Sequence, residues 1–319
     1  MGGEAFAVDA SMIVADANRR RGVAKVEDLD PTSSRAVAEY LSVLDDAAFG
    51  AATLTEPKSI SPTDPAARYT AAADTPAVYA YSDNYLVDLK NAVIMDVEAT
   101  TAVRPAEVGA AKTMIDRTAE QFDITPSRLV GDAGYGSAEM VGWLVDEREI
   151  EPHVKLMDKS ERTDGTFSRS DFAYDPEGNF YVCPGGKELK KYHRPFAKPR
   201  AGPTKDGTLI YFDRKQDCDA CALKPKCCPN MPARKIARSI HEAARDKARA
   251  IAKTEAYLVS RRERKKVEML FAHLKRILRL DKLRLRGPTG AKDEFLLAAT
   301  AQNLRKLAKL IPYPMPIFA

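Results

Sequence analysis

The chain has 319 residues, of which 45% are hydrophobic and 30% charged, and its formal net charge at pH 7 is +5. This length allows one large domain or two small ones with a substantial apolar core. No run of about 18 or more apolar residues is present, which excludes a membrane-spanning helix. The N-terminus has no charged segment followed by an apolar one, so we expect no secretory signal peptide.

The first predicted element is a buried strand over residues 5–13 (AFAVDASMI), an apolar run that a single carboxylate, Asp9, interrupts. Because the sequence begins almost directly on this strand, we expect the chain to start at a domain edge. It would then be a fragment of a longer protein.

Residues 14–80 are mixed, with a helical pattern over residues 33–49 and a loop rich in Pro, Ser and Thr over residues 56–70. The next two segments, 85–90 and 92–98, alternate apolar and polar residues around a short turn, which predicts a β-hairpin.

The region after the hairpin alternates helices and strands. Residues 105–122 form a predicted helix with a proline in the first turn, and residues 138–148 form a second. Residues 128–132 (RLVGD) read as a strand that ends on the carboxylate Asp132, and residues 151–157 as another strand. This order predicts an α/β fold around one mixed sheet with helices on its faces.

Residues 158–234 are rich in Gly, Pro, Cys and aromatic residues, and they predict a small β-rich module. All five cysteines lie here, and their odd number in a chain without a secretion signal favours metal binding or free thiols over disulfides. Four thiolates bind Zn²⁺ tetrahedrally, and a small module with few aliphatic core residues often needs a structural metal ion to fold stably. The candidate zinc ligands are Cys183, Cys218, Cys221 and Cys227, with Cys228 as the alternative to Cys227; otherwise all five are reduced thiols.

The chain is predicted to be helical from residue 237 to its end, over residues 237–252, 255–279 and 293–310. Residues 261–286 hold 11 Lys and Arg and 3 acidic residues, a net charge of +8, so the rest of the chain sums to −3. Positive charge concentrated in this way is typical of a surface that faces a polyanion. On this helix Arg264, Glu268 and Lys275 fall within about 60° of one another, beside an apolar stripe.

Three carboxylates stand where strands or the basic helix meet the core, namely Asp9, Asp132 and Glu268. If they converge they repel one another unless cations intervene, and Mg²⁺ is the natural partner of clustered oxygen ligands. Two such ions about 3.5–4 Å apart can activate an attacking oxygen and stabilise the leaving oxygen of a phosphodiester.

Three motifs together resemble the catalytic domain of a bacterial insertion-sequence DDE transposase. They are VDAS around Asp9, LVGDAGYGS around Asp132, and Arg264-x3-Glu268-x6-Lys275. The resemblance implies a ribonuclease-H-like fold over residues 1–157 and 235–319, with residues 158–234 as a cysteine-rich insertion before the last catalytic helix. Where the family often has a tyrosine three residues before the arginine, this chain has Arg261.

The resemblance implies metal-dependent hydrolysis and strand transfer of DNA, with transposon ends and target DNA as partners and a homodimer as the active form. It also implies a cytoplasmic, nucleoid-associated bacterial protein, here without the N-terminal DNA-binding region of full-length relatives. The implied residues are Asp9, Asp132 and Glu268 as ligands of two Mg²⁺ ions, and Arg264, Lys275, Arg261 and Lys265 as DNA contacts.

Alternatives stay open for the first acid and for the function. Asp88 and Asp96 also lie on predicted strands ahead of Asp132, but a ribonuclease-H-like sheet places its first acid on strand one, which favours Asp9. The chain could instead be a non-catalytic DNA-binding remnant of a transposase, or a ribonuclease-H-like nuclease without transposition. A decayed copy would be expected to lose at least one acid, and all three are present.

Overall fold

The computed structural model describes residues 2–18, 21–53, 55–71, 75–158, 161–193, 202–205 and 207–310. The chain divides into two compact units, which we treat separately. The predicted insertion, residues 158–234, falls within the second unit. The first unit comprises Met1–Tyr135, Arg148–Lys155 and Ile251–Ala319, and the second comprises Gly136–Glu147 and Leu156–Ala250.

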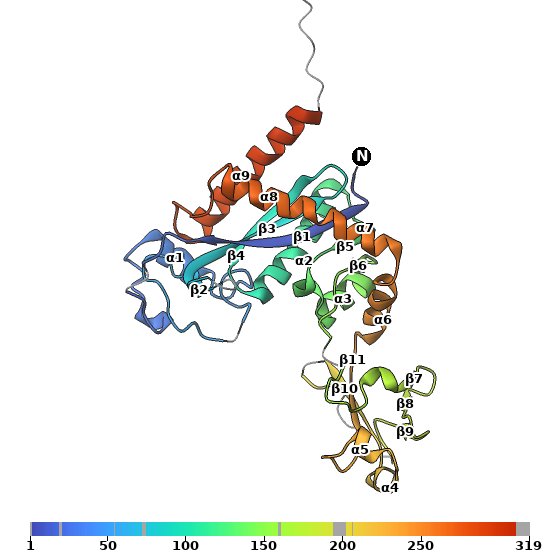
Figure 1. Ribbon diagram of the computed structural model, residues 1–319. Coiled ribbons are helices and arrows are strands. Elements are labelled where there is room, and N and C mark those ends of the chain that lie inside the picture. The colour runs from blue at the N-terminus through green and yellow to red at the C-terminus, as the bar shows by residue number, and fades with distance from the viewer. Residues whose placement is uncertain are drawn as a thin grey trace, which may run out of the picture. The chain divides into compact units, whose positions relative to one another are not determined.

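The first unit is built on a six-stranded sheet with the order β2-β3-β1-β5-β6, in which β4 also pairs with β3 (Figure 1). β1 is antiparallel to β3 and parallel to β5, and β5 is parallel to β6. The sheet is therefore mixed, as predicted. The strands are β1 (Ala5–Val14), β2 (Arg68–Thr70), β3 (Val78–Asp88), β4 (Val93–Thr101), β5 (Arg128–Val130) and β6 (Glu151–His153).

Helices cover both faces of this sheet. Because successive residues of a strand point to opposite faces, residues of β3 contact helices on both sides. On one face lies α2 (Arg104–Phe122), whose Glu107 accepts a hydrogen bond from Ser82 of β3 at 2.7 Å. On the other face lies α8 (Lys265–Arg276), whose Phe271 stacks on Tyr85 of β3. α9 (Gly287–Leu310) packs beside α8 through Gln302, and α1 (Arg35–Ser42) packs against α9. The fold is a mixed α/β fold with helices on both faces of the sheet, consistent with a ribonuclease-H-like domain.

Several helix predictions were wrong in their limits: the pattern over residues 33–49 is helical only as α1, and α9 begins six residues before the predicted start at 293. Two further differences concern the helices around the basic segment. The single helix expected over residues 255–279 is two helices, α7 (Glu255–Glu263) and α8, which meet at Arg264. The Arg264 backbone keeps helical dihedral angles, so the apolar spacing gave no sign of the interruption. The helix expected from residue 237 begins at Glu242 as α6 (Glu242–Ile251), because the preceding residues pair with another strand instead.

The second unit contains two small sheets and short helices. Its core is aromatic, with Phe172, Tyr181 and Tyr211 packed together with Leu189 and Ile236. The antiparallel partner of β10 is β11, whose last three residues, 237–239, were predicted as the start of a helix. The elements are α3 (Ala138–Gly142), a π-helical turn (Trp143–Glu147), β7 (Ala173–Asp175), β8 (Phe180–Val182), β9 (Glu188–Leu189), β10 (Thr208–Phe212), α4 (Lys215–Asp219), α5 (Lys224–Cys227), β11 (Lys235–Ser239) and α6.

Asp64, in the core of the first unit, predicts a pH dependence of stability. Its side chain is fully buried and accepts a hydrogen bond from the Tyr81 hydroxyl at 2.5 Å, and burial raises its pKa to about 6. Because the folded pKa exceeds the unfolded value, the stabilisation is fully present below about pH 4 and is lost as the pH rises through about 6. From this group we expect the free energy of unfolding to fall by at most about 3 kcal/mol over that range.

Urea unfolding of the wild type and of Asp64→Asn at about pH 5 and pH 7 measures this effect. The variant should lose less stability with rising pH, since every other titrating group is common to both proteins. Equal losses in the two proteins would contradict the prediction.

Candidate active site

Two of the predicted acids lie level with each other on adjacent parallel strands. β1 and β5 pair with Ala7 opposite Val130, so that Asp9 and Asp132 come two residues later along each chain. Asp9 lies within β1, whereas Asp132 follows the last residue of β5. This arrangement follows from the parallel register and brings together two carboxylates that are 123 residues apart in sequence.

The third acid, Glu268, comes to the same place on α8. Asp9 lies opposite Tyr85 in the β1–β3 pairing and therefore on the same face of the sheet. Phe271 stacks on the Tyr85 ring, and Glu268 precedes it by about one turn of the helix. The helix thus lies across the sheet with its acid close to Asp9.

The charges of these groups act on one another. Burial raises the pKa of Asp9 to about 6; the Ala10 N–H and Arg264 lower it, and the carboxylates of Asp132 and Glu268 raise it. Arg264 donates to Glu268 at 3.0 Å, and all three acids help to raise its own pKa. A guanidinium therefore lies among the three carboxylates and partly neutralises them.

The turn after β5 holds Asp132 in a fixed orientation. Its Oδ1 accepts the Gly134 N–H at 2.7 Å and lies 3.8 Å from Nη1 of Arg104, which also pairs with Glu107 at 3.0 Å. A Cβ at Gly134 would lie 2.4 Å from that Nη1, so a side chain there would require the Arg104 guanidinium to move away. Tyr135, fully buried, has a pKa raised well above its usual value by burial and by Asp9, Glu107 and Asp132.

Three of these neighbours, Arg104, Glu107 and Tyr135, were not predicted from sequence. Tyr135 was in the quoted turn motif but was given no role, and Arg104 and Glu107 open a helix whose first turn gave only a capping signal. Their contact with the acids depends on how α2 packs beside the end of β5, which local pattern does not reveal.

The two alternatives for the first acid have structural partners. Asp88 accepts the Gly3 N–H at 3.1 Å and the Asn91 N–H at 2.9 Å, which closes the β3–β4 turn. Asp96 forms a two-point ion pair with Arg117 of α2, at 2.6 and 3.0 Å. These contacts favour Asp9 as the first acid, in the position that a ribonuclease-H-like sheet implies.

The predicted DNA-contacting cations have different surroundings. Arg261 and Lys265 are exposed, on α7 and α8. Lys275 is half-buried; burial lowers its pKa, while Asp83 and Asp281 raise it. Asp83 is fully buried on β3, and burial raises its pKa well above the usual range. Lys275 thus lies over a buried acid, in line with Glu268 on the same face of α8.

The five cysteines gather around one small cavity of the second unit, with a volume of about 20 Å³. The sulfur of Cys183 accepts the Lys187 N–H at 3.3 Å, and a Cβ at Gly185 would lie 3.4 Å from Sγ of Cys221 and 3.6 Å from that of Cys183. Burial raises the pKa of Cys218 to about 11 and of Cys227 to about 12, and in both cases the nearby Cys228 raises it further.

Neither the three acids nor the five cysteines are arranged as a complete set of metal ligands. Among the residues that the structure describes, no three or more Cys, His, Asp or Glu side chains are arranged to hold a metal. The donor chemistry nevertheless fits. A divalent cation bound by the three acids would reduce the repulsion between them and lower the raised pKa of Asp9. Zn²⁺ bound by the closely spaced thiols of the second unit would stabilise their deprotonated form in the same way.

Comparison with known protein families gives a match over the C-terminal part of the chain. Residues 182–308 match a family model described as "Transposase DDE domain", a range that contains all five cysteines, Arg264, Glu268 and Lys275. No curated protein matches, and no solved structure does. Asp9 and Asp132 lie outside the matched range, so their assignment depends on strand register and electrostatics. Within the described residues, no helix is both long and apolar enough for a bilayer crossing.

Proposed function

Because residues 182–308 match the transposase DDE domain family, we propose that this chain acts on DNA as an active transposase, which hydrolyses DNA phosphodiester bonds and transfers the resulting strand ends. The observation that carries this proposal is the convergence of Asp9, Asp132 and Glu268 around Arg264. A purely structural helix would not be expected to bring an acid to a site that already holds two.

In this proposal each residue has a defined task. Asp9, Asp132 and Glu268 would hold two Mg²⁺ ions, which when bound supply the Lewis acidity for attack on the phosphorus. Arg104 fixes the orientation of Asp132 from the α2 side. Arg264, released from its pair with Glu268, would bind the scissile phosphate, since a guanidinium matches the geometry of phosphate oxygens. Arg261, Lys265 and Lys275 would extend the DNA contact along the same helices.

The direct test is a nicking assay on supercoiled DNA with Mg²⁺ or Mn²⁺. We expect nicked and linear products that depend on the added metal and disappear with a chelator. A folded protein that binds DNA yet never nicks it under these conditions would favour a second candidate, a non-catalytic DNA-binding remnant. The observation that supports this second candidate is that, among the described residues, the acids are not arranged as a set of metal ligands.

We also propose that the cysteine module binds one structural Zn²⁺ through Cys183, Cys218, Cys221 and either Cys227 or Cys228. The proposal is supported by the gathering of all five cysteines around one small cavity, where Sγ of Cys183 accepts the Lys187 N–H. Full-length protein purified without chelators should contain about one zinc per chain.

Single Cys→Ser replacements test the ligand set by elemental analysis. Replacement of Cys183, Cys218 or Cys221 should remove the zinc, and only one of the replacements at Cys227 and Cys228 should do so. Ala222→Ser, within the same segment, is the matched control and should keep the metal. Folded wild-type protein without zinc would contradict the proposal.

A further inference from the structure

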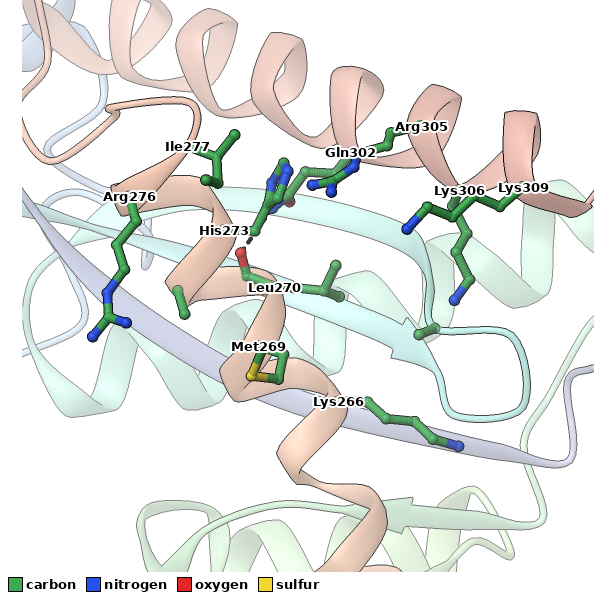
Figure 2. A pocket seen from close by; sticks show the side chains of 12 residues that line it. Lys266, Met269, Leu270, His273, Arg276, Ile277, Gln302, Arg305, Lys306 and Lys309 are labelled. Carbon is green, nitrogen blue, oxygen red and sulfur yellow. Dashed lines mark hydrogen bonds between the residues drawn. The ribbon is translucent and has the colours of Figure 1, made fainter.

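A groove between α8 and α9 has none of the three acids among its lining residues and is unused by the proposed chemistry. Figure 2 shows the residues that line it. Its volume is about 500 Å³. Gln302 of α9 donates to the Leu270 carbonyl at 2.7 Å and lies 3.2 Å from His273 Nδ1, which joins the two helices at its base. All the elements involved belong to the first unit, so the groove is a feature of one compact body.

The groove is strongly cationic. Lys266 and Arg276 of α8 and Arg305, Lys306 and Lys309 of α9 line it, and no Asp or Glu does (Figure 2). Within the part of the chain that the structure describes, Lys266 has an ion pair, with Glu263 at 3.5 Å, and the other four cations have none. Burial, Arg305 and Lys309 lower the pKa of His273, as expected where the local potential is positive. Five cations in a groove that no carboxylate lines, four of them without an ion pair among the described residues, fit a polyanion.

The groove floor indicates which part of the polyanion it would contact. Met269 and Ile277 line it with 67% and 65% of their surface exposed, and none of the lining residues is Phe, Tyr or Trp. Sequence-independent binding of unpaired bases usually depends on aromatic stacking, which this floor does not offer. Aliphatic side chains between cations suit the sugar–phosphate backbone of a duplex, whose contacts position DNA without reading its sequence.

The groove lies to one side of the acid on α8. At about 100° per residue, its lining residues from this helix range from about 40° (Ala272) to about 180° (Ile277) around the helix from Glu268, and none of the three acids lines the groove. DNA that follows the groove would therefore run along a different side of the helix from the scissile phosphate.

We propose that the α8–α9 groove binds the backbone of a second DNA segment, distinct from the segment at Asp9, Asp132 and Glu268. The inference rests on the proposed function only in taking DNA as the partner. It assigns to α8 two DNA-contacting faces, one for cleavage and one for holding a second duplex.

The test uses full-length protein and a duplex of arbitrary sequence, with affinity measured by fluorescence anisotropy over a series of salt concentrations. Lys306→Glu/Lys309→Glu should weaken binding at least about tenfold, and the slope of log K against log salt should fall by about 2. Lys253→Glu/Lys292→Glu is the matched control, with the same charge change at exposed positions of the first unit outside the groove. It should change affinity much less.

Nicking by the same variants separates this inference from the proposed function. The groove variant should still nick DNA when the DNA concentration is raised to saturation, since its acids are untouched. Unchanged affinity and salt slope in the groove variant would overturn the groove proposal and leave the nuclease proposal standing. A changed oligomeric state in light scattering, with DNA affinity retained, would assign the groove to a second copy of the chain and overturn the proposal equally.

Discussion

Glu268→Gln is expected to lower the rate of metal-dependent DNA nicking about a thousandfold, which corresponds to about 4 kcal/mol of transition-state stabilisation. The amide keeps the shape of the side chain but loses the negative charge that a divalent ion requires. It can still accept a hydrogen bond from Arg264, so the helix should keep its position. The rate is measured on supercoiled DNA under single-turnover conditions, with affinity measured separately by anisotropy.

DNA affinity should be equal to or slightly higher than that of the wild type, because one negative charge has been removed from a cationic surface. Glu255→Gln, an exposed glutamate at the start of α7, is the matched control and should nick at the wild-type rate. If Glu268→Gln nicks as fast as this control, Glu268 is not a metal ligand and the assignment of the three acids fails.

The acids were predictable because each lies in a pattern that can be read locally. Asp9 interrupts an apolar strand, Asp132 follows the end of one by two residues, and Glu268 lies beside the apolar stripe of a helix. Their convergence follows from a parallel register and from one helix that crosses the sheet, which the family resemblance implied. The mixed α/β class could be predicted because strand and helix periodicities in the first unit agree with the tertiary fold, whereas the strand order was not predicted and β2 lies in a segment expected to be loop.

Features that depend on packing between distant segments were not predictable. The contacts of Arg104 and Glu107 with the Asp132 turn require α2 to pack beside β5. The last three residues of β11 were predicted as helix because the partner strand, β10, begins 27 residues earlier than β11 and local pattern does not include the energy of strand pairing. The buried Asp83 beneath Lys275 was missed for a related reason: its strand was recognised only from residue 85 onward.

Phe271→Ala is expected to lower the free energy of unfolding of the first unit by about 3–5 kcal/mol. It is also expected to slow nicking per folded molecule, which the loss of stability alone would not do. The Phe271 ring is 8% exposed and stacks on Tyr85 with centroids 4.7 Å apart and an angle of 18°. Tyr85 is the cross-strand neighbour of Asp9, so this stack sets the height and rotation of α8 over the first acid. With the ring removed, Glu268 would lose its fixed position one turn away, and small displacements of catalytic groups are costly.

Phe295→Ala separates stability from positioning, because Phe295 is fully buried in α9 and makes no stack on the β3 ring that supports α8. Both variants should be destabilised to a similar degree in urea, and nicking is compared per folded molecule at a temperature where each is native. Phe295→Ala should nick near the wild-type rate, Phe271→Leu at an intermediate rate, and Phe271→Ala at least about tenfold more slowly. Equal rates for the two alanine variants would mean that the Phe271–Tyr85 stack contributes to stability alone, and that Glu268 is held over Asp9 by the ion pairs and hydrogen bonds of α7 and α8 instead.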